Sequence, residues 1–177
     1  MRYDYDRFDF LIRQEITQGS ETDVIYRVPD FVGNLFGTPD RKDRKYGAGG
    51  RLLEDPDCFY HYDDEGNLIF REFKRLQETG VRYDRKRMEK ERGVRCLATG
   101  TGWLYEWSSN GMLKKVIRPD GRPVEFRYDA LGRRTAKQYL SKVTRWVWDG
   151  NVPLHEWSYK IPDMQPDKEE KDRKSVV

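Results

Sequence analysis

The sequence contains few of the residues that build redox or metal sites. It has two cysteines, Cys58 and Cys96, and two histidines, His61 and His155, among 177 residues. No CxxC or Cys/His ligand spacing connects them, and two cysteines cannot define a disulfide framework. We expect unpaired thiols, with a single bridge as the alternative. Both histidines sit inside strand patterns far apart in the sequence, so we interpret them as strand-face residues rather than metal ligands or catalytic groups.

Long apolar runs and catalytic motifs are also missing. The sequence has no run of about 18 apolar residues and no apolar segment after Met1, so it predicts neither a transmembrane helix nor a standard signal peptide. The glycine-rich stretch at 46–50 lacks the spacing of a phosphate loop. No serine lies in a GxSxG motif. We therefore predict no enzymatic activity and no cofactor.

The composition favours a thin sheet over a thick aliphatic core. Charged residues make up 37% of the chain and the mean hydropathy is −0.99, yet aromatic residues reach 14%. The apolar content is thus concentrated in rings, which suit the face of a sheet. The net charge of +3 arises from 34 basic and 31 acidic residues that are largely interleaved. This pattern indicates alternating strand faces more than a surface for nucleic acid, whose binding is not expected.

One stretch, residues 124–134, shows how the chain is organised. Val124, Phe126 and Tyr128 alternate with charged residues, so a strand places the three large apolar side chains on one face. Asp129 ends the strand and can turn its carboxylate onto backbone N–H groups two residues on. Gly132 can adopt the positive φ that reverses the chain. The stretch predicts a β-hairpin.

The same pattern recurs along the sequence. Residues 60–68 and 103–113 repeat the alternation and the glycine, and residues 26–35 and 46–52 are weaker copies. Several consecutive copies lie roughly 16 to 21 residues apart, a spacing typical of a repeat architecture. The fold class predicted is therefore all-β, built of tandem antiparallel β-hairpin repeats. The residues that define the motif are Tyr62, Asp63, Gly66, Trp107, Gly111, Tyr128, Asp129, Gly132, Trp148, Asp149 and Gly150.

The pattern sets the expected domain organisation. We assign residues 1–160 to one repeat region, interrupted at 73–95 by a charged insertion or long hairpin in which residues 85–92 form a short helix or a solvated loop. Strand pattern resumes over residues 97–107. Residues 161–177 are charged and lack periodicity, so we predict a disordered tail.

Residues 128–134 (YDALGRR), the degenerate copies before them and the tryptophan-rich segment 146–157 resemble the YD repeats of Rhs proteins. Related repeats occur in the C component of insecticidal toxin complexes and in animal teneurins. The resemblance is tight over 103–157, looser over 3–70, and absent from about 73–95 and after 160. It implies a curved, spiralling sheet that closes into a shell around a C-terminal toxin, and proteins that are commonly secreted or displayed at the cell surface.

Several other groups of residues have a functional and a structural interpretation. The carboxylate pairs Asp63/Asp64 and Asp55/Asp57 suit acid–base chemistry, but turn formation explains them better. The basic runs at 41–45 and 82–92 adjoin acidic residues and are interpreted as solvated surface. A set of rings suits stacking on sugars or bases but is more typical of packing between strands. These rings belong to Trp103, Tyr105, Trp107, Trp146 and Trp148.

Together these observations favour a non-catalytic structural segment of a YD-repeat shell. The alternative is a surface module that binds carbohydrate or a polyanion, and a small nuclease is the least favoured interpretation. Because the outer strands of a partial array expose unpaired N–H and C=O groups, we expect self-association or pairing with other repeat segments. The family resemblance adds a toxin cargo as a partner in the full-length context.

Overall fold

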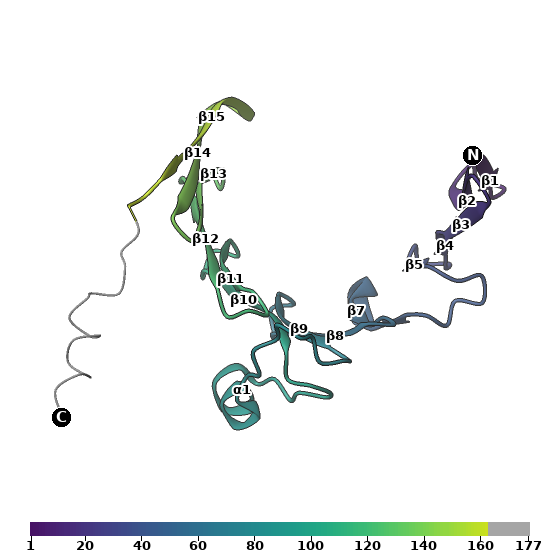
Figure 1. Ribbon diagram of the computed structural model, residues 1–177, viewed down its shortest axis with the longest axis horizontal. Helices are drawn as coiled ribbons and strands as arrows, with labels where there is room; N and C mark the ends of the chain where they lie inside the picture. Colours follow the sequence, from purple (N-terminus) through teal and green to yellow (C-terminus); the bar gives the residue numbers. More distant parts are fainter. Residues whose placement is uncertain (163–177) are drawn as a thin grey trace. The chain divides into compact units, whose positions relative to one another are not determined.

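A computed structural model gives the structure of residues 1–162 (Figure 1). Within these residues the chain forms antiparallel β-strands, one 3-10 helix and one α-helix. The all-β antiparallel fold expected from the alternation is therefore confirmed. The predicted disordered tail, apart from its first two residues, lies outside the described residues. None of the described helices has the length and apolar character needed to cross a membrane.

The chain divides into two compact units, Met1–Gly102 and Trp103–Val177. The first unit contains β1 (Arg2–Tyr5), β2 (Leu11–Gln18), β3 (Glu21–Tyr26), β4 (Val28–Pro29), β5 (Leu35–Phe36), β6 (Lys45–Tyr46), η1 (Ala48–Gly50), β7 (Leu52–Glu54), β8 (Cys58–Tyr62), β9 (Leu68–Phe73) and α1 (Arg85–Arg92). The second unit contains β10 (Gly102–Trp107), β11 (Leu113–Ile117), β12 (Pro123–Tyr128), β13 (Arg134–Tyr139), β14 (Lys142–Asp149) and β15 (Val152–Lys160). The first residue of β10, Gly102, belongs to the first unit.

The strands follow one another in space in the order in which they occur in the sequence. Strands β1 to β3 form a three-stranded sheet, β4 and β5 a two-stranded sheet, and β6 to β15 a ten-stranded sheet in unbroken chain order. In the second unit each strand pairs antiparallel with the one before it, from β10·β11 to β14·β15. Within the second unit this order results because tight turns join consecutive strands, and tight turns allow antiparallel pairing only.

The register brings the alternating rings of the second unit onto one face. Tyr105 pairs with Val116, Val116 with Val124, and Val124 with Tyr139, and directly paired residues share a face of the sheet. We call this the ring face; its large members are Trp103, Tyr105, Trp107, Phe126, Tyr128, Tyr139, Trp146 and Trp148, all half-buried.

The most buried side chains of the second unit are aliphatic. On the face opposite the rings, Leu104, Ala136 and Val143 are no more than 5% exposed. Ala136 is paired with Arg127 on one side and Arg145 on the other, so long side chains flank it in the sheet. Burial in this unit is thus greatest on the face opposite the rings, and the large aromatic side chains remain partly accessible.

Residues 74–101 interrupt the strand order in the first unit. The helical alternative for residues 85–92 is the one found, because α1 is capped at both ends. The Asp84 carboxylate accepts hydrogen bonds from the N–H groups of Lys86 and Arg87, and Gly93 ends the helix with φ 64°. The strand expected over 97–107 begins only at Gly102. Residues 97–101 are held instead by a buried carboxylate, which is described below.

Candidate functional site

A single turn geometry recurs seven times within residues 1–162. It spans five residues: the N–H of the first donates to the carbonyl oxygen of the fifth, and the N–H of the fourth donates to the carbonyl oxygen of the first. The turns occupy residues 6–10, 30–34, 47–51, 63–67, 108–112, 118–122 and 129–133. The fourth residue always has positive φ, between 62° at Asp9 and 89° at Gly33 and Gly66. Glycine suits this position because it has no Cβ.

The turn that begins at Asp129 shows how the aspartate contributes. Its Oδ1 accepts hydrogen bonds from the N–H groups of Leu131 at 2.9 Å and Arg133 at 3.0 Å. Its Oδ2 accepts a third bond from Arg133 Nε at 2.7 Å. Desolvation raises the pKa of the Asp129 carboxyl, but these hydrogen bonds outweigh it, so the pKa lies below its usual value. All three bonds lie within the turn, so the carboxylate stabilises the turn that it begins.

The motif residues that precede each turn lie where the strand register shifts. The shifts fall between His61 and Tyr62, between Glu106 and Trp107, and between Arg127 and Tyr128. Such a bulge accompanies a three-residue hairpin loop whose last residue has positive φ. The motif glycines Gly66, Gly111 and Gly132 occupy that position, with φ of 89°, 76° and 79°. Tyr62 precedes the turn at 63–67 and Asp63 begins it. Asp63 Oδ1 accepts the N–H of Asn67 at 2.7 Å.

The copy formed by Trp148, Asp149 and Gly150 has a different turn. Asp149 pairs with Val152, so only Gly150 and Asn151 connect β14 to β15. Gly150 has φ 55°. This connection is a two-residue hairpin loop rather than the five-residue turn of the other copies.

Two turns with the shared geometry were not recognised as motif copies from the sequence. In residues 6–10 the fourth position is Asp9 instead of glycine, and in residues 118–122 the first position is Arg118 instead of aspartate. Each departs from the pattern at one of its two defining positions.

A buried carboxylate organises the interruption between β9 and β10. The Glu72 side chain is fully buried and accepts hydrogen bonds from the N–H groups of Leu97, Ala98 and Gly100 at 2.8, 2.8 and 2.9 Å. Burial raises the pKa of the Glu72 carboxyl, but the hydrogen bonds from His61 and from these backbone groups have the larger, opposite effect. The pKa is lowered to about 2. The carboxylate remains ionised because these hydrogen bonds outweigh the effect of burial, and it holds the N–H groups of residues 97, 98 and 100 in place.

His61 is part of this arrangement. Its Nε2 lies 3.1 Å from Glu72 Oε2, and its ring stacks on Phe70 with ring centroids 5.7 Å apart. His155 lies on β15 with an exposed side chain. The described residues include no group of three or more His, Cys, Asp or Glu side chains arranged to hold a metal ion.

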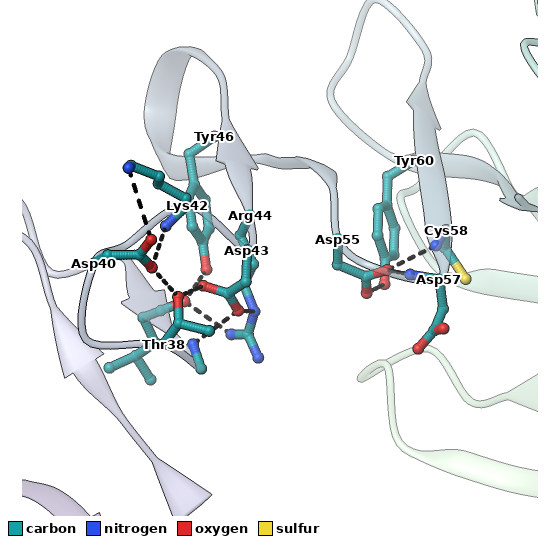
Figure 2. Close-up of polar contacts among 12 residues, drawn as sticks. Thr38, Asp40, Lys42, Asp43, Arg44, Tyr46, Asp55, Asp57, Cys58 and Tyr60 are labelled. Carbon is teal, nitrogen blue, oxygen red and sulfur yellow. Dashed lines mark hydrogen bonds and ion pairs between the residues drawn. The ribbon is translucent and has the colours of Figure 1, made fainter.

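The carboxylate pair Asp55/Asp57 does not form a paired acid–base site. Figure 2 shows Asp55 turned toward the backbone of the following residues and toward Tyr60. Its Oδ1 accepts the N–H groups of Asp57 and Cys58 at 2.9 and 2.7 Å, and its Oδ2 accepts the Tyr60 hydroxyl at 2.6 Å. Burial and the bond to Asp55 raise the pKa of Tyr60. Cys58 is buried, and both Cys58 and Cys96 are free thiols.

The basic run at 41–45 is tied to acidic neighbours. The Thr38 hydroxyl donates to Asp43 Oδ1 at 3.0 Å, and Arg44 Nε lies 3.3 Å from Asp43 Oδ2 (Figure 2). Lys42 Nζ lies 3.8 Å from Asp40 Oδ2. These contacts organise the loop between β5 and β6, so its carboxylates have structural partners.

Arginine side chains stack on the ring face. The Arg118 guanidinium lies 5.6 Å from the ring centre of Trp103 and 5.1 Å from that of Tyr139. Arg134 lies 5.8 Å from Phe126 and 5.0 Å from Trp146. These are cation–π distances, so the guanidinium groups share the face with the rings and connect one strand to another.

The last strand, β15, is an exposed edge. It pairs with β14 on one side and stands at the end of the strand order. All nine of its residues are exposed, including the large apolar side chains of Val152, Leu154, Trp157 and Tyr159. An edge strand of this length presents a row of backbone groups to any further strand.

Comparisons with known proteins agree with this description. The chain is 33% identical over 141 residues to "Probable deoxyribonuclease RhsB" and 29% identical over 141 residues to "Probable deoxyribonuclease RhsA", both of Dickeya dadantii (strain 3937). Each alignment covers 78% of this chain but only 8% of the relative. The chain therefore spans a small part of the length of these relatives.

A family model described as RHS Repeat matches residues 107–144. The matched residues contain the turns at 108–112, 118–122 and 129–133 together with the strands between them. The matched region is structural, since its aspartate and glycine residues shape the backbone. What this chain shares with the family is the repeating unit of turn and strand, and the chain contains repeats of the Rhs, or YD-repeat, type.

Proposed function

We propose that this chain is a non-catalytic segment of a shell wall, part of a larger YD-repeat protein that encloses a C-terminal toxin. The observation that carries the proposal is the sheet whose ten strands follow chain order and end in an exposed edge. Such a sheet grows by adding one hairpin after another, because each turn is completed by its own residues. A wall of this kind can be extended at β15 without rearranging what precedes it.

The names of the two relatives refer to DNA hydrolysis, and we assign that activity to parts of those proteins outside the aligned stretch. The acidic residues that a nuclease would use have other partners in this chain. Asp129 caps its turn, Asp55 bonds to Tyr60, and Glu72 holds the backbone of residues 97–101. These contacts support a structural role for the carboxylates.

We further propose that β15 pairs with another strand of the same kind, either from the next repeat or from a second copy of this chain. Its backbone groups on the outer side gain hydrogen bonds when such a strand is added, and its exposed apolar side chains gain cover. A toxin cargo would be a partner of the assembled shell and not of this segment alone.

Self-association tests the edge. Leu154→Lys places a charge in the middle of β15, whereas Leu131→Lys makes the same change in an exposed turn away from it; the two leucines are 57% and 76% exposed. By size-exclusion chromatography with light scattering, we expect the wild type and Leu131→Lys to form oligomers and Leu154→Lys to be monomeric. A wild-type chain that stays monomeric at high concentration would contradict pairing between copies of this chain and leave only pairing with the next repeat.

Catalytic activity is tested separately with the same protein. We expect no cleavage of double- or single-stranded DNA in the presence of Mg²⁺ or Mn²⁺, and no self-cleavage on storage. Hydrolysis that disappears when one named side chain, such as His61 or Asp55, is replaced would overturn the structural assignment. The two tests are independent, because a monomeric protein without nuclease activity would still be a wall segment that needs its neighbours.

A carbohydrate- or polyanion-binding module is the second candidate, and the half-buried rings are the observation that favours it. Acrylamide quenching of tryptophan fluorescence distinguishes the two functions, because ligand stacking requires accessible ring faces. The structure gives these rings internal partners: Trp146 Nε1 donates to Glu156 at 2.7 Å and Trp148 Nε1 to the carbonyl oxygen of Arg134 at 2.9 Å. Because Trp157 is exposed on β15, the measurement uses Trp157→Phe. We expect weak quenching of the remaining tryptophans and no change in it on adding heparin or an oligosaccharide.

A further inference from the structure

The first two turns of the repeated geometry differ from the others at their tips. The second and third residues of a turn form its tip, and they are Arg7 and Phe8 in the first turn and Phe31 and Val32 in the second. Phe8 is 63% exposed, Phe31 is fully exposed and Val32 is 74% exposed. None of the other five turns described carries an aromatic ring at its tip. Since the shared geometry does not require these rings, they are available for another role.

The two tips border one groove in the first unit. The groove has a volume of about 1100 Å³ and lies between the residues that follow β1 and those around β4 and β5. Its apolar lining comes from Phe8, Phe10, Leu11, Pro29, Phe31 and Leu35. Binding pockets for small molecules measure about 300–1,000 Å³, so this groove has room for several amino-acid side chains.

The basic and acidic side chains that line the groove differ in their partners. Arg7, Arg27 and Arg41 line it, and all three side chains are exposed. The two acidic residues of the lining, Asp6 and Asp30, turn inward to their own backbone. Asp6 Oδ1 accepts the N–H groups of the third and fifth residues of its turn, at 2.8 and 3.0 Å, and Asp30 Oδ1 does the same, at 2.9 Å each.

This arrangement leaves exposed guanidinium groups beside an apolar lining. Arg7 shows how close they lie, because its guanidinium is 4.7 Å from the ring centre of Phe8. A ligand that fits both features carries apolar side chains for the apolar lining and carboxylates for the arginines, which bind carboxylates through paired hydrogen bonds.

We propose that this groove binds an extended peptide segment of a partner protein, in which large apolar side chains alternate with aspartate or glutamate. Phe8 and Phe31 contact the apolar side chains, and Arg27 and Arg41 pair with the carboxylates. The groove lies in the first unit, whereas the edge β15 lies in the second, so this surface is independent of strand addition at β15.

The test uses the complete chain and a short fluorescein-labelled peptide in which Phe and Leu alternate with Glu. Two control peptides carry Lys in place of Glu, or Ala in place of Phe and Leu. Fluorescence anisotropy at low and moderate salt should show saturable binding of the acidic apolar peptide alone. Binding should weaken with added salt, since part of the attraction is between charges.

Matched variants locate the binding surface. Phe8→Ser/Phe31→Ser should weaken binding by about tenfold or more, because aromatic side chains dominate such contacts. The control Leu131→Ser/Leu140→Ser removes two exposed apolar side chains elsewhere and should leave binding unchanged. All four side chains are exposed, so the fold does not depend on them; circular dichroism of each variant verifies this.

A second pair of variants tests the charges. Arg27→Gln/Arg41→Gln should weaken binding by about fivefold at low salt and reduce its salt dependence. Arg82→Gln/Lys137→Gln removes the same charge at exposed positions elsewhere and should have little effect.

Several outcomes would overturn the proposal. Equal binding of the lysine peptide would remove the role of the arginines, and equal binding by all variants would remove the groove. Absence of binding at millimolar peptide would do so as well. If Phe8→Ser/Phe31→Ser instead converted an oligomer to a monomer, the groove would be an interface between copies of this chain. If the wild type bound anionic vesicles but not the peptide, its occupant would be a lipid surface.

Discussion

Two kinds of carboxylate accept hydrogen bonds from backbone N–H groups in this chain, and they differ in how far along the sequence those groups lie. Asp129 bonds to residues two and four positions later, in an exposed turn that has several close relatives along the chain. Glu72 bonds to residues 25, 26 and 28 positions later, and its side chain is fully buried. A hairpin completed by its own residues can be repeated freely, whereas a long interruption needs a partner from outside itself.

The two carboxylates contribute differently to stability. An exposed carboxylate trades hydrogen bonds to water for hydrogen bonds to the backbone, and the net gain is small. A buried carboxylate that loses its charge leaves several N–H groups with a weaker acceptor and fewer acceptor positions, and that cost is large because water cannot replace the lost bonds. Disrupting Glu72 should therefore affect the molecule more than disrupting any single turn.

The largest effect is expected for Glu72→Gln. The amide keeps the size of the side chain but removes the charge, so Leu97, Ala98 and Gly100 compete for one weaker acceptor. We expect the free energy of opening residues 97–101 to fall by about 2–4 kcal/mol. Native-state hydrogen exchange of these N–H groups measures it directly.

The matched control is Glu125→Gln, which removes an exposed carboxylate 3.2 Å from Lys115 in the second unit. We expect a change below about 0.5 kcal/mol there, as for most surface ion pairs. Equal hydrogen exchange of residues 97–101 in the wild type and Glu72→Gln would show that another contact holds this segment.

Acid should act on the same carboxylate, with a smaller effect at moderate pH. The pKa of Glu72 is lowered from its usual 4.5 to about 2, so its contribution to stability is complete above pH 4.5 and decreases as pH falls toward 2. Hydrogen exchange of residues 97–101, corrected for its intrinsic pH dependence, should accelerate across that range.

The Glu72→Gln variant sharpens the acid experiment, because it has no carboxyl at this position to protonate. Its residues 97–101 should open with little additional dependence on pH below 4.5. If the variant and the wild type showed the same acid-induced opening, the effect would come from other carboxylates of the chain.

A smaller effect is expected for Asp129→Ala in the repeated turn. Three hydrogen bonds are lost, but the turn is exposed and water satisfies the freed N–H groups. We expect a loss of about 1 kcal/mol in the stability of the second unit, as for the removal of a capping side chain. Urea unfolding followed by tryptophan fluorescence measures it.

Asp149→Ala is the control for that prediction. Asp149 is exposed in the two-residue turn, and its side chain makes no hydrogen bond to any described residue. Its replacement should change stability by less than about 0.5 kcal/mol. Similar losses for both variants would mean that the aspartate matters through general charge and not through its turn.

The same difference between local and distant contacts decides which features could be predicted from the sequence. Local features could be: the alternation of Val124, Phe126 and Tyr128 predicts a strand, and Gly132 predicts the turn that follows, because both depend on neighbouring residues. The Trp148 to Gly150 copy matched by residue type but adopts a shorter loop, since its pairing with β15 and not its motif decides the length.

Features that depend on distant partners could not be predicted. Glu72 looked like any charged residue in an alternating strand, and residues 97–101 looked like the start of the next strand. Only their contact across 25 or more positions shows that one holds the other. The partner of His61 was hidden for the same reason. The exposed Phe8 and Phe31 gave no signal, because a sequence pattern does not show which rings lack cover.

The smallest effect is expected where the turn geometry and the residue disagree. Asp9 occupies the position of positive φ that glycine fills in six other described turns, with φ 62°. Asp9→Gly removes strain of roughly 1 kcal/mol, but glycine loses a similar amount of conformational freedom on folding. We expect a net gain of at most about 0.5 kcal/mol, measured by hydrogen exchange at the N–H of Asp6 and its neighbours.

The reverse change at an equivalent position completes this test. Gly111 has φ 76°, and a Cβ added there meets no atom within 4 Å, so Gly111→Asp introduces the backbone strain without a steric clash. It should destabilise its turn by about 0.5–1 kcal/mol, opposite in sign to Asp9→Gly. If both substitutions changed stability in the same direction, the positive φ would not be the property that makes glycine recur in this turn, and residue 9 would have to be explained by its own contacts.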